Sequence, residues 1–198
     1  MNQRLQGASL IIAPLLAMAA TFLWVDGRYG AAGGTLLALS GVFWAHGFTG
    51  LFAVIGRRMP VYGSAGLLLA LFGCLGAIAF GLQGFFEEVF RVSGPQSLAA
   101  LAHYPVLSNL VLWLPGPLFP LTVFGLGVVL TWRRWAPVWI GPLLCLAAAV
   151  FPASRIPRIE WVATVADVLL LLPFAYLGWT LIRQRDLTAR RARGEAHG

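Results

Sequence analysis

Asp167 raises the sharpest chemical question in this sequence, because it interrupts an apolar stretch, TVADVLLLLPF at residues 164–174. A carboxylate in a bilayer core costs about 2.5–3.5 kcal/mol on insertion scales, and such residues face the bundle interior or water. A carboxyl group that takes up and releases a proton there would suit proton-coupled transport. The structural alternative is that Asp167 bonds to backbone near a kink, or pairs with Arg155 or Arg158.

Other polar residues fall in or beside the apolar runs at similar depth. Helix rise places Asp167 roughly 10 Å below the outer surface and Ser40 near that level, while Asn109 and Gln83 are shallower. This distribution predicts a polar pocket that opens to the outside and binds or transports a small molecule. The predicted ligand-binding or proton sites are Asp167, His46, Ser40, Asn109, Gln83 and Trp113.

Histidines suggest a second chemistry. His46 lies roughly 20 Å deep by helix rise, so it fits a packing residue, a proton relay or a haem ligand. A haem or metal site would combine it with His103, or combine His103 with Glu87 and Glu88 of the outer loop. We predict no cofactor, with haem or metal as the alternative. The sequence has no catalytic motif, so we predict no catalytic residues and expect a non-enzymatic protein.

Small residues recur every three or four positions in the third apolar run. This pattern lets helices approach closely where the hydrophobic effect cannot drive association. The face could pack within the chain, or dock on a membrane-protein partner or a second copy, which makes an accessory subunit the alternative function. Its members are Gly66, Ala70, Gly73, Ala77 and Gly81.

The composition sets the class of protein. Hydrophobic residues make up 59% of the 198-residue chain and charged residues 11%, with a mean hydropathy of +0.81. Because soluble domains carry about 25% charged residues, the sequence predicts an all-α integral membrane protein. Six apolar runs are long enough to span a bilayer, at 8–25, 33–56, 63–83, 106–131, 136–153 and 161–182.

Arginine placement predicts the orientation. All fourteen basic residues are arginine. With the N-terminus inside, ten lie in cytoplasmic segments and four outside, which follows the positive-inside rule. We therefore expect both termini to be cytoplasmic, in the plasma (inner) membrane of a bacterium. The ten are Arg4, Arg57, Arg58, Arg133, Arg134, Arg183, Arg185, Arg190, Arg191 and Arg193, and the four are Arg28, Arg91, Arg155 and Arg158.

Three further features complete the prediction. The motif PGPLFP, residues 115–120, predicts a broken fourth helix, because proline removes a backbone donor. SLAALAHY, residues 97–104, predicts a short interfacial helix in the outer loop. We divide the chain into a six-helix transmembrane domain, 1–183, and a basic cytoplasmic tail, 184–198. The expected partners are the lipid bilayer and, at the tail, anionic lipid; the clustered charges do not indicate nucleic acid.

Overall fold

The described chain is built from helices, as the sequence predicts. A computed structural model describes the backbone of residues 2–25 and 27–195, and side chains as far as residue 183. The predicted tail, 184–198, therefore lies largely outside the described side chains. The elements are α1 (Gln3–Phe22), α2 (Gly30–Gly56), α3 (Pro60–Val89), α4 (Gly94–Ala102), α5 (Pro105–Ser108), the π-helix η1 (Asn109–Trp113), α6 (Pro115–Arg133), α7 (Ile140–Arg155) and α8 (Glu160–Glu195).

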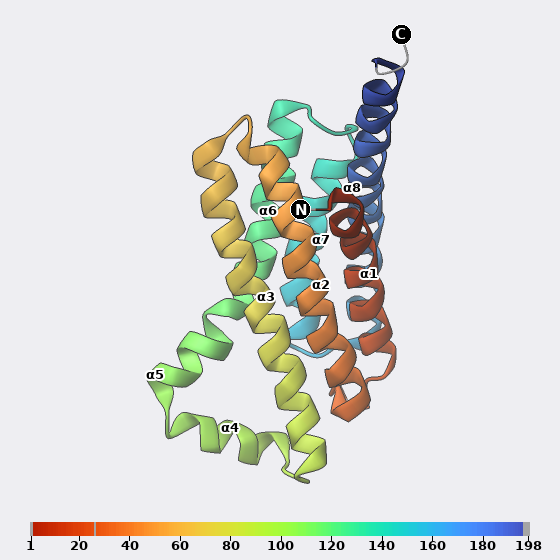
Figure 1. Cartoon of the computed structure of the whole chain (residues 1–198). Helices are drawn as coiled ribbons and strands as arrows, with labels where there is room; N and C mark the ends of the chain where they lie inside the picture. The colour runs from red at the N-terminus through yellow and green to blue at the C-terminus, as the bar shows by residue number, and fades with distance from the viewer. Residues whose placement is uncertain (1, 26, 196–198) are drawn as a thin grey trace.

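Six long helices form a closed ring in the order α1, α2, α3, α6, α7, α8. Consecutive helices of the ring pack side by side, and α1 closes it by packing on α8 (Figure 1). The segment α4–α5–η1 is an excursion between α3 and α6. In Figure 1 α4 runs sideways from the lower end of α3, and this end of the bundle is here called the α4 end. The first turn of α1 and the last turns of α8 lie toward the upper end, here called the terminal end.

The helices confirm a multi-pass membrane protein. Five of them are long and apolar enough to cross a bilayer, namely Gln3–Phe22, Gly30–Gly56, Pro60–Val89, Pro105–Arg133 and Glu160–Arg183. The apolar helix α7, Ile140–Arg155, has 16 residues. Since α6 ends at the terminal end and α8 begins at the α4 end, the chain must traverse the bundle between them, and α7 makes that passage.

Aromatic side chains fill the centre of the ring. Trp44 and Phe48 of α2 meet Phe119 of α6 and Phe174 of α8, and each of the four is at most 6% exposed. The ring centroid of Trp44 lies 4.5 Å from that of Phe174 and 5.3 Å from that of Phe119, both edge-on. Edge-to-face contacts of this kind favour close packing, so the middle of the bundle is a solid core.

The interruption of the fourth span is real but lies before the prolines. The backbone is a π-helix over Asn109–Trp113, and the Leu114 N–H donates to the Asn109 carbonyl five residues back, at 2.8 Å. From Pro115 onward α6 is continuous through Pro120. Our placement of the break within residues 115–120 is therefore wrong. For Pro115 and Pro117 the physical reason is that the first-turn N–H groups of a helix have no intrahelical acceptor, so proline costs little there. Pro120 lies further inside the helix, which continues past it.

The predicted short helix is confirmed as α4, but it begins earlier than residue 97. Ser93 and Gln96 form a capping box, in which the Ser93 side chain accepts from the Gln96 N–H and the Gln96 side chain accepts from the Ser93 N–H. Such reciprocal bonds satisfy two otherwise unpaired backbone donors. The cap therefore sets the start of α4 at Gly94.

Candidate functional site

Asp167 lies on α8 about two turns from its start and is 1% exposed. Its Oδ1 accepts a hydrogen bond from Arg155 Nη2 at 2.7 Å, and its Oδ2 accepts one from the Thr21 hydroxyl at 2.6 Å. Arg155 Nη2 also donates to Thr21 Oγ1 at 3.2 Å. Both carboxylate oxygens are thus hydrogen-bonded. The structure therefore contains the pairing of Asp167 with Arg155 that the sequence offered as the structural alternative.

The length of α7 explains why this pair is internal. Sixteen residues span about 24 Å at 1.5 Å per residue. Arg155 is the last residue of α7, and residues 156–159 connect it to the start of α8 at Glu160. Asp167 is seven residues further along α8, or about 10 Å back into the bundle. Because α7 is short, it ends inside the bundle, and its last residue, Arg155, lies at the same depth as Asp167.

Aromatic rings complete the surroundings of Arg155. Its guanidinium carbon lies 5.1 Å from the Trp24 ring centroid and 5.2 Å from that of Phe151, within cation–π range. The Trp24 ring meets Tyr29 edge-on at 5.2 Å. Burial raises the pKa of the Tyr29 phenol, an effect that the nearby Arg155 charge opposes. Tyr29 therefore remains a neutral hydroxyl at physiological pH.

This ion-pair cluster, defined as Thr21, Trp24, Tyr29, Arg155 and Asp167, ties three helices together at the α4 end. Among the described residues, Arg155 Nη1 and Trp24 Nε1 are buried there without a hydrogen-bond partner. Double hydrogen bonding and charge pairing are the conditions under which a buried carboxylate is tolerated. The arrangement holds α1, α7 and α8 together and does not present Asp167 to a pocket.

His46 and Ser40 belong to the contact between α1 and α2. His46 Nδ1 lies 2.9 Å from Ser9 Oγ, and Ser40 Oγ donates to the Ala13 carbonyl at 2.9 Å. One helical turn beyond His46, Gln6 Nε2 donates to Thr49 Oγ1 at 3.1 Å. These bonds pair polar groups across two helices, so the two predicted site residues serve the α1–α2 contact.

Gln83, Glu87 and Glu88 lie near the end of α3, where Gln83 bonds to α4 and Glu88 bonds to the start of α2. Gln83 Nε2 donates to Glu87 Oε1 at 2.9 Å and to Ser97 Oγ of α4 at 3.3 Å. Glu88 Oε2 accepts from the Ala31 N–H at 2.7 Å, at the start of α2. A carboxylate is favourable there because the first N–H groups of a helix carry partial positive charge. These three residues therefore hold α2, α3 and α4 in position relative to one another.

Arg28 extends this network to the start of α4. Its Nη1 lies 3.8 Å from Glu87 Oε2. A Cβ added to Gly94, the first residue of α4, would fall 2.7 Å from the Arg28 guanidinium carbon. Glycine thus lets the arginine reach the base of α4, which adds a second attachment of the excursion.

His103 ends α4, and its Nδ1 lies 2.9 Å from the Ala99 carbonyl. The region that the structure describes contains no group of three or more His, Cys, Asp or Glu side chains able to hold a metal ion. His46 lies sixteen residues along α2 from the α4 end, or about 24 Å. The structure therefore does not bring His46 and His103 together.

The small-residue face of α3 is occupied inside the chain. A Cβ on Gly66 would collide with the Phe52 ring, one on Gly73 would lie 2.7 Å from the Phe119 Cα, and one on Gly81 would lie 2.6 Å from the Gly34 carbonyl oxygen. Ala70 is fully buried, and Ala77 is half-buried. The face packs on α2 and α6, so it is not free to dock a partner. The accessory-subunit alternative therefore has no support from this face.

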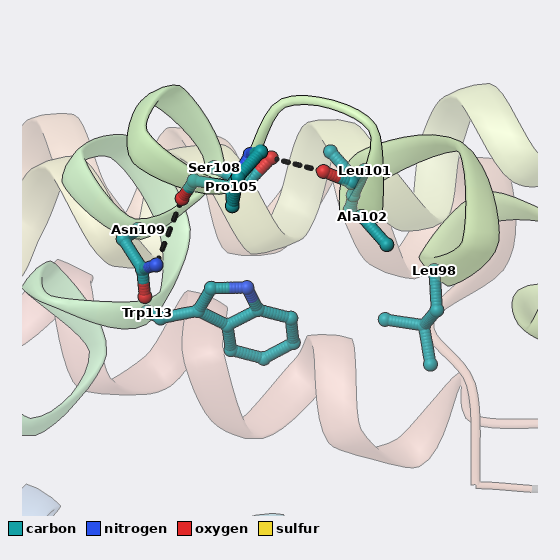
Figure 2. A pocket seen from close by; sticks show the side chains of 7 residues that line it. All are labelled: Leu98, Leu101, Ala102, Pro105, Ser108, Asn109 and Trp113. Atoms are coloured by element: carbon teal, nitrogen blue, oxygen red, sulfur yellow. Dashed lines mark hydrogen bonds between the residues drawn. The ribbon is translucent and has the colours of Figure 1, made fainter.

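Asn109 and Trp113 are the two predicted site residues that line one pocket. This pocket, of about 340 Å³, lies between α4 and the α5–η1 segment. Figure 2 shows the Trp113 indole lying across it between Asn109 and Leu98. We call it the α4–η1 pocket; it is lined by Leu98, Leu101, Ala102, Pro105, Ser108, Asn109 and Trp113.

The polar groups of this pocket are partly committed to the backbone. Ser108 Oγ donates to the Leu101 carbonyl at 2.8 Å, which ties α5 to α4, and Asn109 Nδ2 donates to the Pro105 carbonyl at 2.8 Å. Asn109 Oδ1 accepts no hydrogen bond from the described residues and points toward the Trp113 side in Figure 2. It is therefore the acceptor that the pocket offers to a ligand.

Sequence reasoning missed several polar residues that the structure uses. Thr21 and Ser9 lie in the first apolar run and Gln6 just before it; Thr21 meets Asp167 and the other two meet α2. The signal that could have found them is their polar type within or beside that run. Trp24 reads as an interfacial residue in the sequence, but the structure places its ring against Arg155.

Comparisons with known proteins leave the geometry to carry the functional argument. The chain matches no protein-family model, no curated protein and no solved structure.

Proposed function

We propose that this protein is a non-enzymatic multi-pass membrane protein that binds a neutral, hydroxyl-bearing amphiphile in the α4–η1 pocket. The observation that carries the proposal is the combination of apolar walls with one free amide oxygen, Asn109 Oδ1. The volume of about 340 Å³ falls within the usual range for ligand pockets, about 300–1,000 Å³.

The chemistry of the lining selects the ligand class. The walls are apolar residues with an indole, and no charged side chain takes part. An ionic headgroup would remain unpaired there, at a cost. A hydroxyl group can donate to Asn109 Oδ1 while its chain lies on Leu98, Leu101 and Trp113. Monoacylglycerols have this form.

The backbone at the pocket supports a binding role. The pocket is bounded by a π-helix, and π-bulges recur at functional sites in other proteins. The Ser108 bond to α4, together with the Gln83 bond to Ser97, holds both walls in place. Preorganised walls lower the ordering cost of binding.

The surface around the pocket suits approach from the bilayer. Tyr104, Val106 and Leu107 are 65%, 69% and 62% exposed. Exposed apolar patches of this kind mark membrane or ligand interaction sites. A ligand dissolved in the membrane could therefore reach the pocket sideways, without passing through water.

Orientation follows from the arginine distribution, with both termini cytoplasmic and the α4 end outside, in the plasma membrane of a bacterium. The pocket then lies at the outer leaflet, which retains the predicted outward site. Transport and proton coupling through Asp167 are not part of the proposal, because aromatic side chains fill the bundle centre and Asp167 is paired with Arg155.

Photo-crosslinking tests the proposal. The purified protein in phosphatidylcholine nanodiscs is irradiated with a monoacylglycerol carrying a diazirine in its acyl chain, and labelled peptides are mapped by mass spectrometry. We expect labels within residues 98–113. Asn109→Ala should weaken binding about fivefold, which corresponds to about 1 kcal/mol for one hydrogen bond.

Two tryptophan substitutions on α4 separate the pocket from its surroundings. Ala102 is exposed and lines the pocket, while Ala100 is exposed on the same helix and does not. Ala102→Trp should fill the pocket and reduce labelling at least tenfold, whereas Ala100→Trp should leave it within twofold. Equal labelling of the two variants would show that the probe does not occupy this pocket.

A further inference from the structure

A second pocket, of about 250 Å³, lies between α2 and α3 at the terminal end. The backbones approach closely beside it, because a Cβ on Gly63 would lie 2.5 Å from the Gly56 Cα. We call it the α2–α3 pocket; it is lined by Thr49, Phe52, Ala53, Gly56, Pro60, Gly63, Ser64 and Leu67.

The lining joins apolar and hydroxyl-bearing side chains. Phe52, Ala53 and Leu67 supply apolar walls, and Ala53 and Ser64 are exposed. Thr49 Oγ1 is already used, since it donates to the His46 carbonyl at 2.6 Å and accepts from Gln6. The Ser64 hydroxyl has no bond to another described residue, so it is available to a ligand.

Two arginines lie in the turn that adjoins this pocket. Gly56 and Pro60 both line it, and the turn that joins them consists of Arg57, Arg58 and Met59. Arg57 and Arg58 are exposed, and the Arg58 guanidinium carbon lies 5.2 Å from the Trp135 ring centroid. Stacking on an indole leaves the edge of a guanidinium free to donate hydrogen bonds.

The chain supplies no described counter-charge at this end. The acidic side chains that the structure describes are Glu87, Glu88, Glu160 and Asp167, and all four lie toward the α4 end. No ion pair joins Arg57 or Arg58 to any of them. An anion is therefore the complementary ligand for the turn beside the pocket.

We propose that the α2–α3 pocket binds an anionic phospholipid. One acyl chain lies along Phe52, Ala53 and Leu67, the phosphate is held by Arg57 and Arg58, and Ser64 hydrogen-bonds the glycerol region. Basic pockets between membrane helices recognise anionic headgroups in this way. A second copy of the chain fits less well, because a symmetric contact would bring four arginines together. The site is independent of the α4–η1 pocket.

Native mass spectrometry of the full-length protein tests this site. Dioleoyl phosphatidylglycerol and dioleoyl phosphatidylcholine are titrated separately, and bound lipids are counted. Arg57→Gln with Arg58→Gln should weaken phosphatidylglycerol binding at least tenfold. The matched control, Arg133→Gln with Arg134→Gln, removes two neighbouring arginines from the end of α6 and should change binding less than twofold. Equal losses in the two pairs would overturn the proposal in favour of diffuse attraction to surface charge.

A second comparison keeps all the charges and fills the pocket. Ala53→Leu should abolish the preference for phosphatidylglycerol, whereas Ala32→Leu, an exposed alanine near the other end of α2, should preserve it. An unchanged preference in Ala53→Leu would mean that the lipid does not enter this pocket. A dimer that Ala53→Leu dissociates would identify a second copy as the occupant and would equally overturn the proposal.

Discussion

At the scale of single residues, the ion-pair cluster carries the largest energetic consequence. Asp167 is 1% exposed and the Arg155 side chain 15% exposed, so removing either partner leaves the other with little access to water. Breaking a buried pair in this way costs about 3–5 kcal/mol in other proteins, while exchanging both members for apolar groups is often neutral.

We therefore predict that Asp167→Ala lowers the free energy of unfolding by about 3–5 kcal/mol. The double variant Asp167→Leu with Arg155→Met should recover most of this loss, because no uncompensated charge remains. Unfolding measured by steric trapping in bicelles would give both values. Glu160→Gln, at the exposed start of α8, should change stability by less than about 0.5 kcal/mol.

A further variant at the same position, Asp167→Asn, separates stability from ligand binding. If the α4–η1 pocket is the binding site, Asp167→Asn should retain monoacylglycerol labelling in whatever fraction of the protein stays folded. Selective loss of labelling in a folded Asp167→Asn protein would return Asp167 to the binding site.

At the scale of elements, the crossing of α2 and α3 depends on glycine. A Cβ on Gly81 would lie 2.6 Å from the Gly34 carbonyl oxygen and 2.8 Å from the Ala38 nitrogen. Backbone atoms cannot move aside as a flexible side chain can, so an added methyl group must separate the helices.

We predict that Gly81→Ala lowers the free energy of unfolding by about 1–3 kcal/mol, the usual cost of overpacking. Gly125→Ala is the matched control on α6, because its nearest atom would be the Tyr62 hydroxyl at 3.4 Å, an ordinary contact. The steric-trapping assay measures both. A Gly81→Ala protein as stable as Gly125→Ala would contradict the close crossing.

The sequence predicted these elements better than their partners. The long apolar runs located the helices, and small-residue spacing identified α3 as a packing element. Which helix α3 packs on depends on the rotation of each helix in the ring, which periodicity does not define. The partner of Asp167 was left open for a similar reason, because the depth of Arg155 follows from where α7 ends. The π-helix before Pro115 has no distinct sequence pattern, so the break was misplaced.

At the scale of the whole molecule, the ring closes through α1 and α8, and the arginines are unequally divided between its ends. Ten are expected on the cytoplasmic side and four outside. This imbalance predicts the orientation of the protein. Because successive helices of the ring cross the bundle in opposite directions, every second connection between them lies on the same side of the membrane.

We predict that a green fluorescent protein fused after Gly198 fluoresces in bacterial cells, because that protein folds in the cytoplasm. A single cysteine at Ser93, with Cys74 and Cys145 changed to alanine, should react with a membrane-impermeant maleimide added to intact cells. A cysteine introduced at Arg57 should react only after lysis. Labelling of the Arg57 position in intact cells would reverse the assigned orientation.

The short helix α7 has a consequence beyond the ion pair that it creates. Its span of about 24 Å faces a hydrocarbon layer of about 30 Å, while α3, with 30 residues, is about 45 Å long. The ring is therefore taller on one side than on the other. From hydrophobic mismatch we expect the lipid beside α7 to be thinned, and two molecules that met along their short sides would share one deformed lipid annulus. We therefore expect membrane thickness to influence where this protein resides and how closely its copies gather.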